Sequence, residues 1–224
     1  MTTLVIAPLR DTALLAKQAA SLDVLSSGRL SLGLGVGRRE DDFIAANREM
    51  PHRGRWFEQQ LEIMRRVWAG EGPAEGVGPV GPEPVQPGGP EILIGGSATA
   101  ALRRAGRLAD GFLGSGDPET AAQQFKIVAE AWQKAGKSGE PRLLATSGVA
   151  LGTDAARRGG DQVRHYNAIY GPEAGDRAAR GLLTSEESVK DVLRRFEDIG
   201  LDEIVFVPRV PDPEMVDRLA DIVG

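Results

Sequence analysis

The chain has 224 residues, of which 41% are hydrophobic and 26% are charged, and this composition excludes disorder of the whole chain. Lys and Arg number 27 against 32 Asp and Glu, which gives a net charge of -5 and disfavours binding to nucleic acid or anionic lipid. Cysteine is absent, so disulfides, thiolate catalysis and sulfur-ligated metals are excluded. His52 and His165 are the only imidazoles, and their separation in sequence gives no pattern for a metal site or a serine–histidine triad.

The sequence carries no targeting or membrane signal. No apolar run approaches the roughly 20 residues that span a bilayer, and the first residues lack the basic and then apolar layout of a signal peptide. We therefore expect a cytoplasmic protein with no membrane or nucleic-acid partner, folded as one domain over residues 1–224.

Strand and helix patterns alternate along the chain. Short aliphatic runs predict six strands, at Leu4–Ala7, Leu30–Val36, Glu91–Ile94, Gly111–Gly114, Leu143–Leu151 and Ile204–Val207. Apolar residues at helical spacing, with caps and stops, predict helices at Ala13–Leu25, Arg53–Trp68, Ala98–Leu108, Pro118–Ala135, after Asp154, from a capping box at Thr184–Glu187 to Ile199, and at Pro213–Ile222. This alternation implies a parallel sheet covered by helices, either doubly wound or a (β/α) barrel, and periodicity alone leaves both open.

Residues 70–90 form the one segment of low complexity. They hold 7 Gly and 6 Pro, which neither a helix interior nor a central strand accommodates. We interpret the segment as a mobile loop within the domain, and we expect it to lie over the strand ends that carry the glycine motifs, either as a lid or as a mere connector.

The first glycine motif is Gly33-Leu34-Gly35-Val36-Gly37, at the end of the second predicted strand. Glycines there allow a flat ligand or a phosphate to approach the backbone, although they equally relieve crowding inside a packed sheet. The motif lacks the third glycine and the immediate helix of a dinucleotide fingerprint, because Arg38 and Arg39 follow instead.

The second motif is Gly95-Gly96-Ser97-Ala98-Thr99, between the third predicted strand and a helix. Free N–H groups at a helix N-terminus, together with two hydroxyls, make a ready anion site. The alternative is that Ser97 simply caps the helix.

Isolated polar residues point to no chemistry by themselves. Arg10, Arg53 and Glu58 fit either a buried ion-pair network or solvated surface charges. His165 fits a pocket lining or, as is commoner for an isolated histidine, an exposed position.

Several runs together resemble the luciferase-like flavin oxidoreductases, which include bacterial luciferase-like monooxygenases and F420-dependent oxidoreductases. The resemblance extends from about Thr2 to the C-terminus, and its specificity comes from the combined runs. These are Leu14 to Asp23, Ser27 to Leu30, Leu32 to Gly37, Arg53 with Glu58 and Trp68, Pro82 to Gln86, Gly89-Pro90, Ile94 to Ser97, Arg103 to Ala105, Asp110 to Phe112 and Gly200 to Ile204.

The resemblance implies a TIM-barrel type of (β/α)8 fold. Members normally open with two further βα units, whereas this chain begins in what resembles the third strand and shows six strands. Because a closed barrel needs all its strands to pair its edges, we expect a chain truncated at its N-terminus, whose open edge recruits further copies into a homodimer or higher homo-oligomer.

The resemblance also implies a cofactor, FMN or alternatively the deazaflavin F420, bound at the C-terminal ends of the strands. Matched by position, Thr3 and Leu4 correspond to a third-strand segment that members often hold with a cis peptide. Gly35, Val36 and Gly37 correspond to the fourth-strand edge beside the cofactor, and Gly95, Gly96, Ser97 and Thr99 to its phosphate turn. The acidic and histidine positions of the first two family strands have no counterpart here, so no catalytic residue is assigned.

These features lead to two hypotheses of different classes. The first is a flavin-dependent oxidoreductase, a monooxygenase that uses reduced FMN and O2 on a small organic substrate, with an F420-dependent dehydrogenase as its close variant. The alternative is a catalytically silent truncated barrel that acts as a binding or structural subunit. A sugar-phosphate enzyme would share the anion site but leaves the matching run from Leu14 to Gly37 unexplained.

Overall fold

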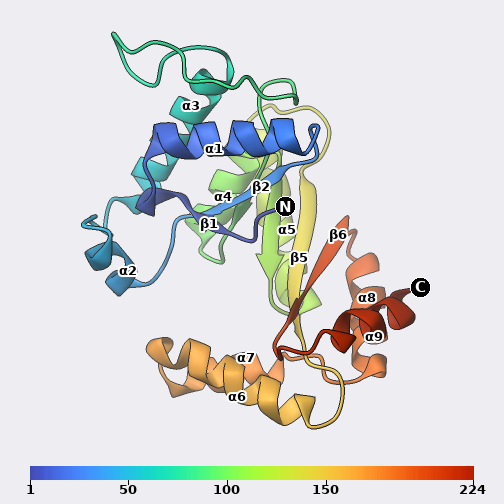
Figure 1. The fold of residues 1–224 in the computed structure, drawn as a ribbon. Helices are drawn as coiled ribbons and strands as arrows, with labels where there is room; N and C mark the ends of the chain where they lie inside the picture. The colour runs from blue at the N-terminus through green and yellow to red at the C-terminus, as the bar shows by residue number, and fades with distance from the viewer. The chain divides into compact units, whose positions relative to one another are not determined.

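The computed structural model describes residues 1–224 without a gap (Figure 1). Contacts divide the chain into two compact units: unit 1 is Met1–Leu113 with Lys126–Arg142, and unit 2 is Gly114–Phe125 with Leu143–Gly224. The sheet has six strands, in the order β1-β2-β3-β4-β5-β6, and the predicted number of strands is confirmed. No helix has both the length and the apolar character needed to cross a membrane.

Strands and helices alternate as the sequence predicts, with small shifts at their ends. The strands are β1 (Val5–Ile6), β2 (Ser31–Gly35), β3 (Glu91–Gly95), β4 (Gly111–Ser115), β5 (Arg142–Val149) and β6 (Glu203–Pro208). The α-helices are α1 (Thr12–Leu25), α2 (Glu40–Ala45), α3 (Arg53–Trp68), α4 (Thr99–Leu108), α5 (Pro118–Lys134), α6 (Ala155–Asn167), α7 (Pro172–Arg180), α8 (Glu186–Glu197) and α9 (Glu214–Val223). The 3-10 helices are η1 (Ala7–Leu9) and η2 (Ala168–Tyr170).

The first four strands pair in parallel and build the core of unit 1. Leu34 of β2 lies opposite Val5 of β1 and Ile94 of β3, and Ile94 lies opposite Phe112 of β4. Leu34, Ile94 and Phe112 are buried to 1% exposure or less, and burial of each such side chain contributes about 1.5–3 kcal/mol. Side chains alternate between the two faces of a strand, so the glycines next to this apolar row face the other side.

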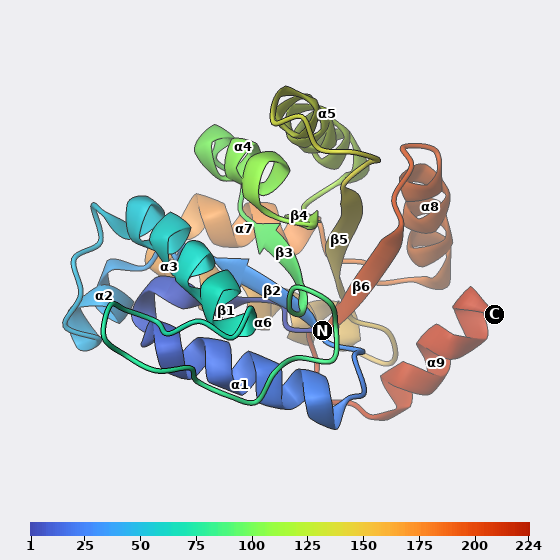
Figure 2. The ribbon, with the colours of Figure 1, turned by 90° about the horizontal axis from the view of Figure 1, so that it is seen from above.

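Helices α1 and α3 pack against each other in unit 1 (Figure 2). The Asp11 carboxylate caps α1 by accepting a hydrogen bond from the Leu14 N–H at 2.9 Å. On α3, the predicted apolar stripe that includes Phe57 and Trp68 is buried. The Trp68 indole N–H donates to the Ala16 carbonyl at 3.0 Å, which joins the two helices.

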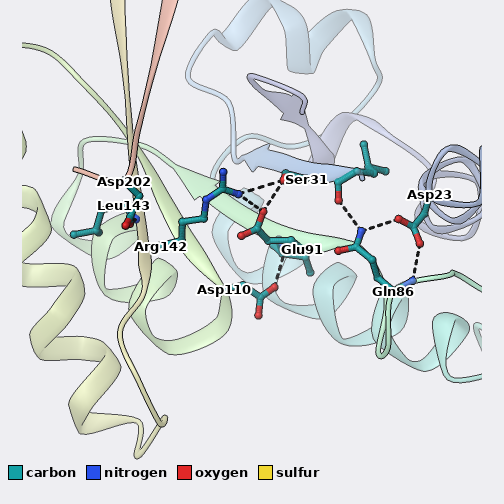
Figure 3. A network of polar contacts seen from close by, with 10 residues as sticks. Asp23, Ser31, Gln86, Glu91, Asp110, Arg142, Leu143 and Asp202 are labelled. Atoms are coloured by element: carbon teal, nitrogen blue, oxygen red, sulfur yellow. Dashed lines mark hydrogen bonds and ion pairs between the residues drawn. The ribbon is translucent and has the colours of Figure 1, made fainter. Parts of the chain in front are cut away.

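Polar side chains join the N-terminal ends of neighbouring strands (Figure 3). The Glu91 carboxylate, at the start of β3, accepts a hydrogen bond from the Ser31 hydroxyl at the start of β2 and pairs with Arg142 at the start of β5, each at 2.6 Å. Asp110, just before β4, accepts from the Ile92 N–H at 2.8 Å. At this end of the strands, the charged groups are therefore satisfied within the protein, as suits a stabilising face.

The Gly/Pro-rich loop at 70–90 is held by one buried carboxylate (Figure 3). Asp23, near the end of α1, has no exposed surface. Its oxygens accept hydrogen bonds from the N–H groups of Val85 and Gln86, at 2.8 and 2.9 Å, and from the Gln86 side-chain amide at 2.6 Å. The same amide donates to the Leu30 carbonyl, next to the N-terminal end of β2, at 2.8 Å.

The prediction that this loop lies over the strand ends that carry the glycine motifs is wrong. The loop leaves α3 after Trp68 and enters β3 at Glu91, so it lies on the side of the sheet where strands begin. It runs along α1 (Figure 2), where the Lys17 amine donates to the Gly81 carbonyl at 2.8 Å. Loops that lead from a helix into a strand lie on the face opposite the active sites of such folds.

Unit 2 contains β5 and β6, which pair in parallel with Ala145 opposite Ile204. Its core includes Val149, Val189 and Met215, none of which has exposed surface. Helix α6 packs against α7, and α8 contacts α9 (Figure 1).

The capping box predicted for the helix that ends near Ile199 is present on α8. Its partners are Ser185 and Ser188, in place of a threonine and a glutamate: each N–H donates to the other hydroxyl at 3.1 Å. The second serine hydroxyl has the reach to serve where a longer acidic side chain was expected.

Two helical segments depart from the sequence-based assignment. α2 is a short helix whose first turn holds Glu40, Asp41 and Asp42, an acidic start that fits a helix N-terminus. The helical stretch after Asp154 divides into α6 and α7 around Gly171, whose φ of 93° favours glycine. On α6, His165 is exposed, in agreement with the simpler of its two readings.

Candidate functional site

The candidate residues belong to unit 1 and lie toward the C-terminal ends of β1, β2 and β3. Gly33 and Gly35 of β2 and Gly95 of β3 lie under the Leu4 side chain. A Cβ atom would come within 3.3 Å of a Leu4 methyl carbon at Gly33, 3.0 Å at Gly35 and 2.7 Å at Gly95. The glycines thus make room for the Leu4 side chain, which packs directly on the backbone of β2 and β3.

The segment that carries Leu4 is fixed to β2. The Thr2 hydroxyl donates to the Gly33 carbonyl at 2.9 Å, and the Thr2 N–H donates to the Ser31 carbonyl at 3.1 Å. The peptide bond between Thr3 and Leu4 is cis, as the family resemblance implied. Leu4 is 37% exposed, so an apolar side chain remains accessible above the glycines of β2 and β3.

The end of β2 turns sharply at Gly37. Its φ of 76° lies in the left-handed region, and an added Cβ would be 2.8 Å from the Ile6 side chain and 3.1 Å from Phe43. The Gly37 carbonyl accepts a hydrogen bond from the Arg53 guanidinium at 3.1 Å, and Val36 is half-buried beside it. Sequence reasoning gave Arg53 no specific role, and only its place at the start of α3 signalled that it could reach this turn.

The turn from Gly95 to Thr99 leads β3 into α4. The N-cap residue of α4 is Ala98, which has no side chain able to cap, and no side-chain cap is present. Ser97 therefore does not cap the helix. Ser97 and Thr99 are exposed, and neither hydroxyl makes a hydrogen bond within the protein.

The backbone of this turn also requires glycine. Gly96 has a φ of 147°, and an added Cβ would be 2.9 Å from the Ala101 methyl group. The first turn of α4 contains no acidic residue that would repel an anion. The N-terminus of α4 is thus open to a ligand with hydrogen-bond acceptors.

The structure brings Leu4, Gly35 and Gly95 into contact on one surface and places Ser97 and Thr99 just beyond it along β3. Thr3 is exposed, and its side chain makes no hydrogen bond. None of the candidate residues carries a carboxylate, imidazole or amine. The candidate residues thus offer backbone groups, hydroxyls and apolar surface to a ligand.

The charged residues noted in the sequence do not form one buried network. Glu58 of α3 pairs with Arg104 and Arg107 of α4, each at 2.9 Å, while Arg10 pairs with neither Glu58 nor Arg53. Burial raises the pKa of the Glu58 carboxyl, but hydrogen bonds from Arg107 and Arg104 outweigh burial and hold that pKa below its ordinary value. The pairs join α3 to α4, the helix whose N-terminus forms the candidate anion site.

Comparison with curated proteins finds relatives that share about a third of their residues with this chain. The chain is 33% identical over 162 residues to the uncharacterized protein Rv0940c of Mycobacterium tuberculosis, a match that covers 67% of this chain and 54% of the relative. The chain thus spans about half the length of the curated relatives it matches.

Solved structures match almost the whole chain. An F420-dependent secondary alcohol dehydrogenase, in complex with an F420-acetone adduct, matches 98% of this chain and 76% of its own with a TM-score of 0.78 and 15% identity. The monooxygenase RslO1 from Streptomyces bottropensis matches 94% of this chain and 71% of its own, with a TM-score of 0.73 and 23% identity. At these identities the matches establish the fold, and the predicted α/β fold of the TIM-barrel type is confirmed.

A protein-family model matches almost the whole length of the chain. The model described as luciferase-like monooxygenase matches residues 1–216, which include every candidate residue and all six strands. The chain belongs to the luciferase-like monooxygenase family.

Proposed function

We propose that this chain is a flavin-dependent oxidoreductase that binds FMN at the C-terminal ends of β1, β2 and β3 and acts with O2 as a monooxygenase on a small organic substrate. The observation that carries the proposal is the open N-terminus of α4. Ser97 and Thr99 there have hydroxyls without protein partners, and the helix lacks a side-chain cap. Such a helix end favours a phosphate group.

The residues present fit this cofactor in two respects. Gly95 to Thr99 would hold the phosphate through backbone N–H groups and hydroxyls, and Gly96 keeps the backbone free of a side chain. The Leu4 side chain, which lies on Gly35 and Gly95 and is 37% exposed, would lie against a planar ring system.

In this proposal, the residues of the chain bind and orient the flavin. The Arg53 hydrogen bond to the Gly37 carbonyl fixes the turn at the end of β2, and the Thr2 contacts fix the segment that carries Leu4. Leu4 and Ile6 provide apolar surface that excludes water from this side of the ligand. The flavin, when bound, supplies the redox chemistry.

The test is titration of the protein with FMN, followed by flavin fluorescence, for the wild type and for Ser97→Ala. Loss of one hydrogen bond should weaken binding by about 1 kcal/mol, or roughly fivefold. Ser138→Ala is the matched control, because Ser138 is exposed in the loop before β5, at the other end of the strands.

The outcomes separate the alternatives. If FMN does not bind and F420 does, with the same sensitivity to Ser97→Ala, the cofactor is the deazaflavin and the chemistry is that of a dehydrogenase. If neither cofactor binds, the proposal fails in favour of a catalytically silent subunit. If Ser138→Ala weakens binding as much as Ser97→Ala, the phosphate does not lie at the turn.

A further inference from the structure

The connection from β2 to α3 comprises residues 38–52 and contains α2. It lies on the face of unit 1 that carries the candidate cofactor site, because a segment that leads from a strand into the next helix lies where parallel strands end. Figure 1 shows α2 beyond the end of β2. This connection therefore has the position at the candidate site that the loop at 70–90 does not have.

The connection is docked on the rest of unit 1 by few buried contacts. Phe43 is the one buried residue of α2, with 1% exposure, whereas the neighbouring Ile44 is 73% exposed. No other helix or strand lies broadly against α2. A Cβ atom at Gly37 would be 2.8 Å from an Ile6 methyl carbon and 3.1 Å from the Phe43 ring, so this ring packs on the Gly37 backbone beside Ile6. A segment with so few buried contacts opens at a small cost in free energy.

One guanidinium joins the two ends of the connection. The Arg53 Nε–H donates to the Gly37 carbonyl at 3.1 Å, and an Nη1–H of the same side chain donates to the Met50 carbonyl at 3.0 Å. Arg53 is half-buried at the start of α3 and pairs with no carboxylate, so its charged group serves these two carbonyls. The ends of the connection cannot separate without the loss of charge-assisted hydrogen bonds.

The contacts of Phe43 lead to the candidate cofactor site. Ile6, which lies beside the Phe43 ring at Gly37, also lies 3.8 Å from the position of a Cβ atom at Gly35. Gly35 in turn lies under the Leu4 side chain. The chain of contacts thus runs from α2 to the side chain against which the flavin ring is proposed to lie.

We propose that Arg53 is a positioning residue that holds residues 38–52 closed beside the candidate cofactor site, and that a bound flavin favours this closed form. The inference rests on the proposed function, since it takes the flavin as the ligand. In the open form, the Gly37 carbonyl loses its hydrogen bond, the Phe43 ring leaves Gly37, and the turn at the end of β2 is no longer fixed. A ligand that binds against Gly35 and Gly37 has a higher affinity for the closed form and shifts the population toward it.

Hydrogen exchange of the flavin-free protein tests the clasp. In Arg53→Ala, the amides of residues 40–48 should exchange roughly tenfold faster than in the wild type, because loss of one charge-assisted hydrogen bond shifts the opening equilibrium by about this factor. Arg53→Lys should give an intermediate rate, since an ammonium lacks the planar fork that donates to two carbonyls at once. Arg55→Ala is the control, because Arg55 is exposed on the same helix and makes no hydrogen bond. Rates at 40–48 in Arg53→Ala that equal those in Arg55→Ala would overturn the clasp.

Titration of the same variants with FMN tests the coupling to the site, with F420 as the probe if FMN does not bind. Arg53→Ala should bind the flavin roughly tenfold more weakly than the wild type, as the closed form becomes less populated. Flavin should also slow exchange at residues 40–48 in the wild type, which a merely structural role of Arg53 would not produce. Wild-type affinity in Arg53→Ala, or exchange at 40–48 that flavin leaves unchanged, overturns the inference and leaves the proposed function intact. If the wild type binds neither flavin, the proposed function fails and this inference fails with it.

Discussion

Replacement of Asp23 by alanine should destabilise the protein through the Gly/Pro-rich loop. The carboxylate is fully buried and accepts hydrogen bonds from the N–H groups of Val85 and Gln86 and from the Gln86 amide. The amide retains the Leu30 carbonyl in the variant, so the two backbone N–H groups carry most of the loss. Hydrogen bonds to a charged group contribute about 1.5–3 kcal/mol each, and we expect a loss of about 3 kcal/mol.

Two assays measure this effect. For a chain of this length, about 3 kcal/mol corresponds to a fall in Tm of roughly 6–12 °C by thermal denaturation. A glutamate-specific protease should also cut faster at Glu71 and Glu75, because the loop is released from α1. The control is Glu62→Ala, which removes an exposed carboxylate from α3. A fall in Tm no larger than that of Glu62→Ala, with unchanged cleavage, would refute the idea that Asp23 anchors the loop.

Two further predictions concern acid stability and association. The pKa of Glu58 is lowered on folding, so its pairs with Arg104 and Arg107 stabilise the protein above the ordinary pKa of 4.5, and this contribution is lost as the pH falls through the lowered value. The stability gap between wild type and Glu58→Gln in urea should be constant near neutral pH and close in acid, and a gap that widens in acid would contradict the reasoning. β1 pairs with β2, and a homo-oligomer in which copies pair through β1 stays a prediction. Hydrogen exchange at Val5–Ile6 should then speed up on dilution, whereas protection that persists in a verified monomer would contradict pairing between copies.

The sequence predicts the elements of this fold well because the patterns are local. The helix from Arg53 to Trp68 has the bounds predicted from its apolar stripe, and Asp11 caps α1 as its residue type suggests. α2 was not predicted because it has only 6 residues, fewer than two turns, and buries a single residue, Phe43. Its acidic first turn was the available signal, and it is weak without a longer apolar pattern.

The position of the Gly/Pro-rich loop was mispredicted for a physical reason. Composition indicates that a segment is a loop, but it does not say to which face of the sheet the loop belongs. The order of the elements does, because a segment between a helix and the strand that follows lies where strands begin. The buried Asp23 could not be found from sequence, since one aspartate in a helix pattern is usually exposed and its partners, Val85 and Gln86, are far away in the chain.

The two ends of the strands in unit 1 differ in how far their polar side chains are hydrogen-bonded within the chain. Where β2 and β3 begin, the Ser31 hydroxyl donates to the Glu91 carboxylate, and Arg142 pairs with the same carboxylate, so these polar groups are satisfied within the chain. Beyond the end of β3, Ser97 and Thr99 have no partner in the chain. Both side chains are exposed, so water satisfies them in the free protein, and a phosphate group can replace that water without breaking a contact within the protein. The contrast between paired groups where the strands begin and solvent-facing hydroxyls where β3 ends therefore supports the proposed cofactor site. It was beyond reach from the sequence because it depends on which partners the fold brings within hydrogen-bond distance.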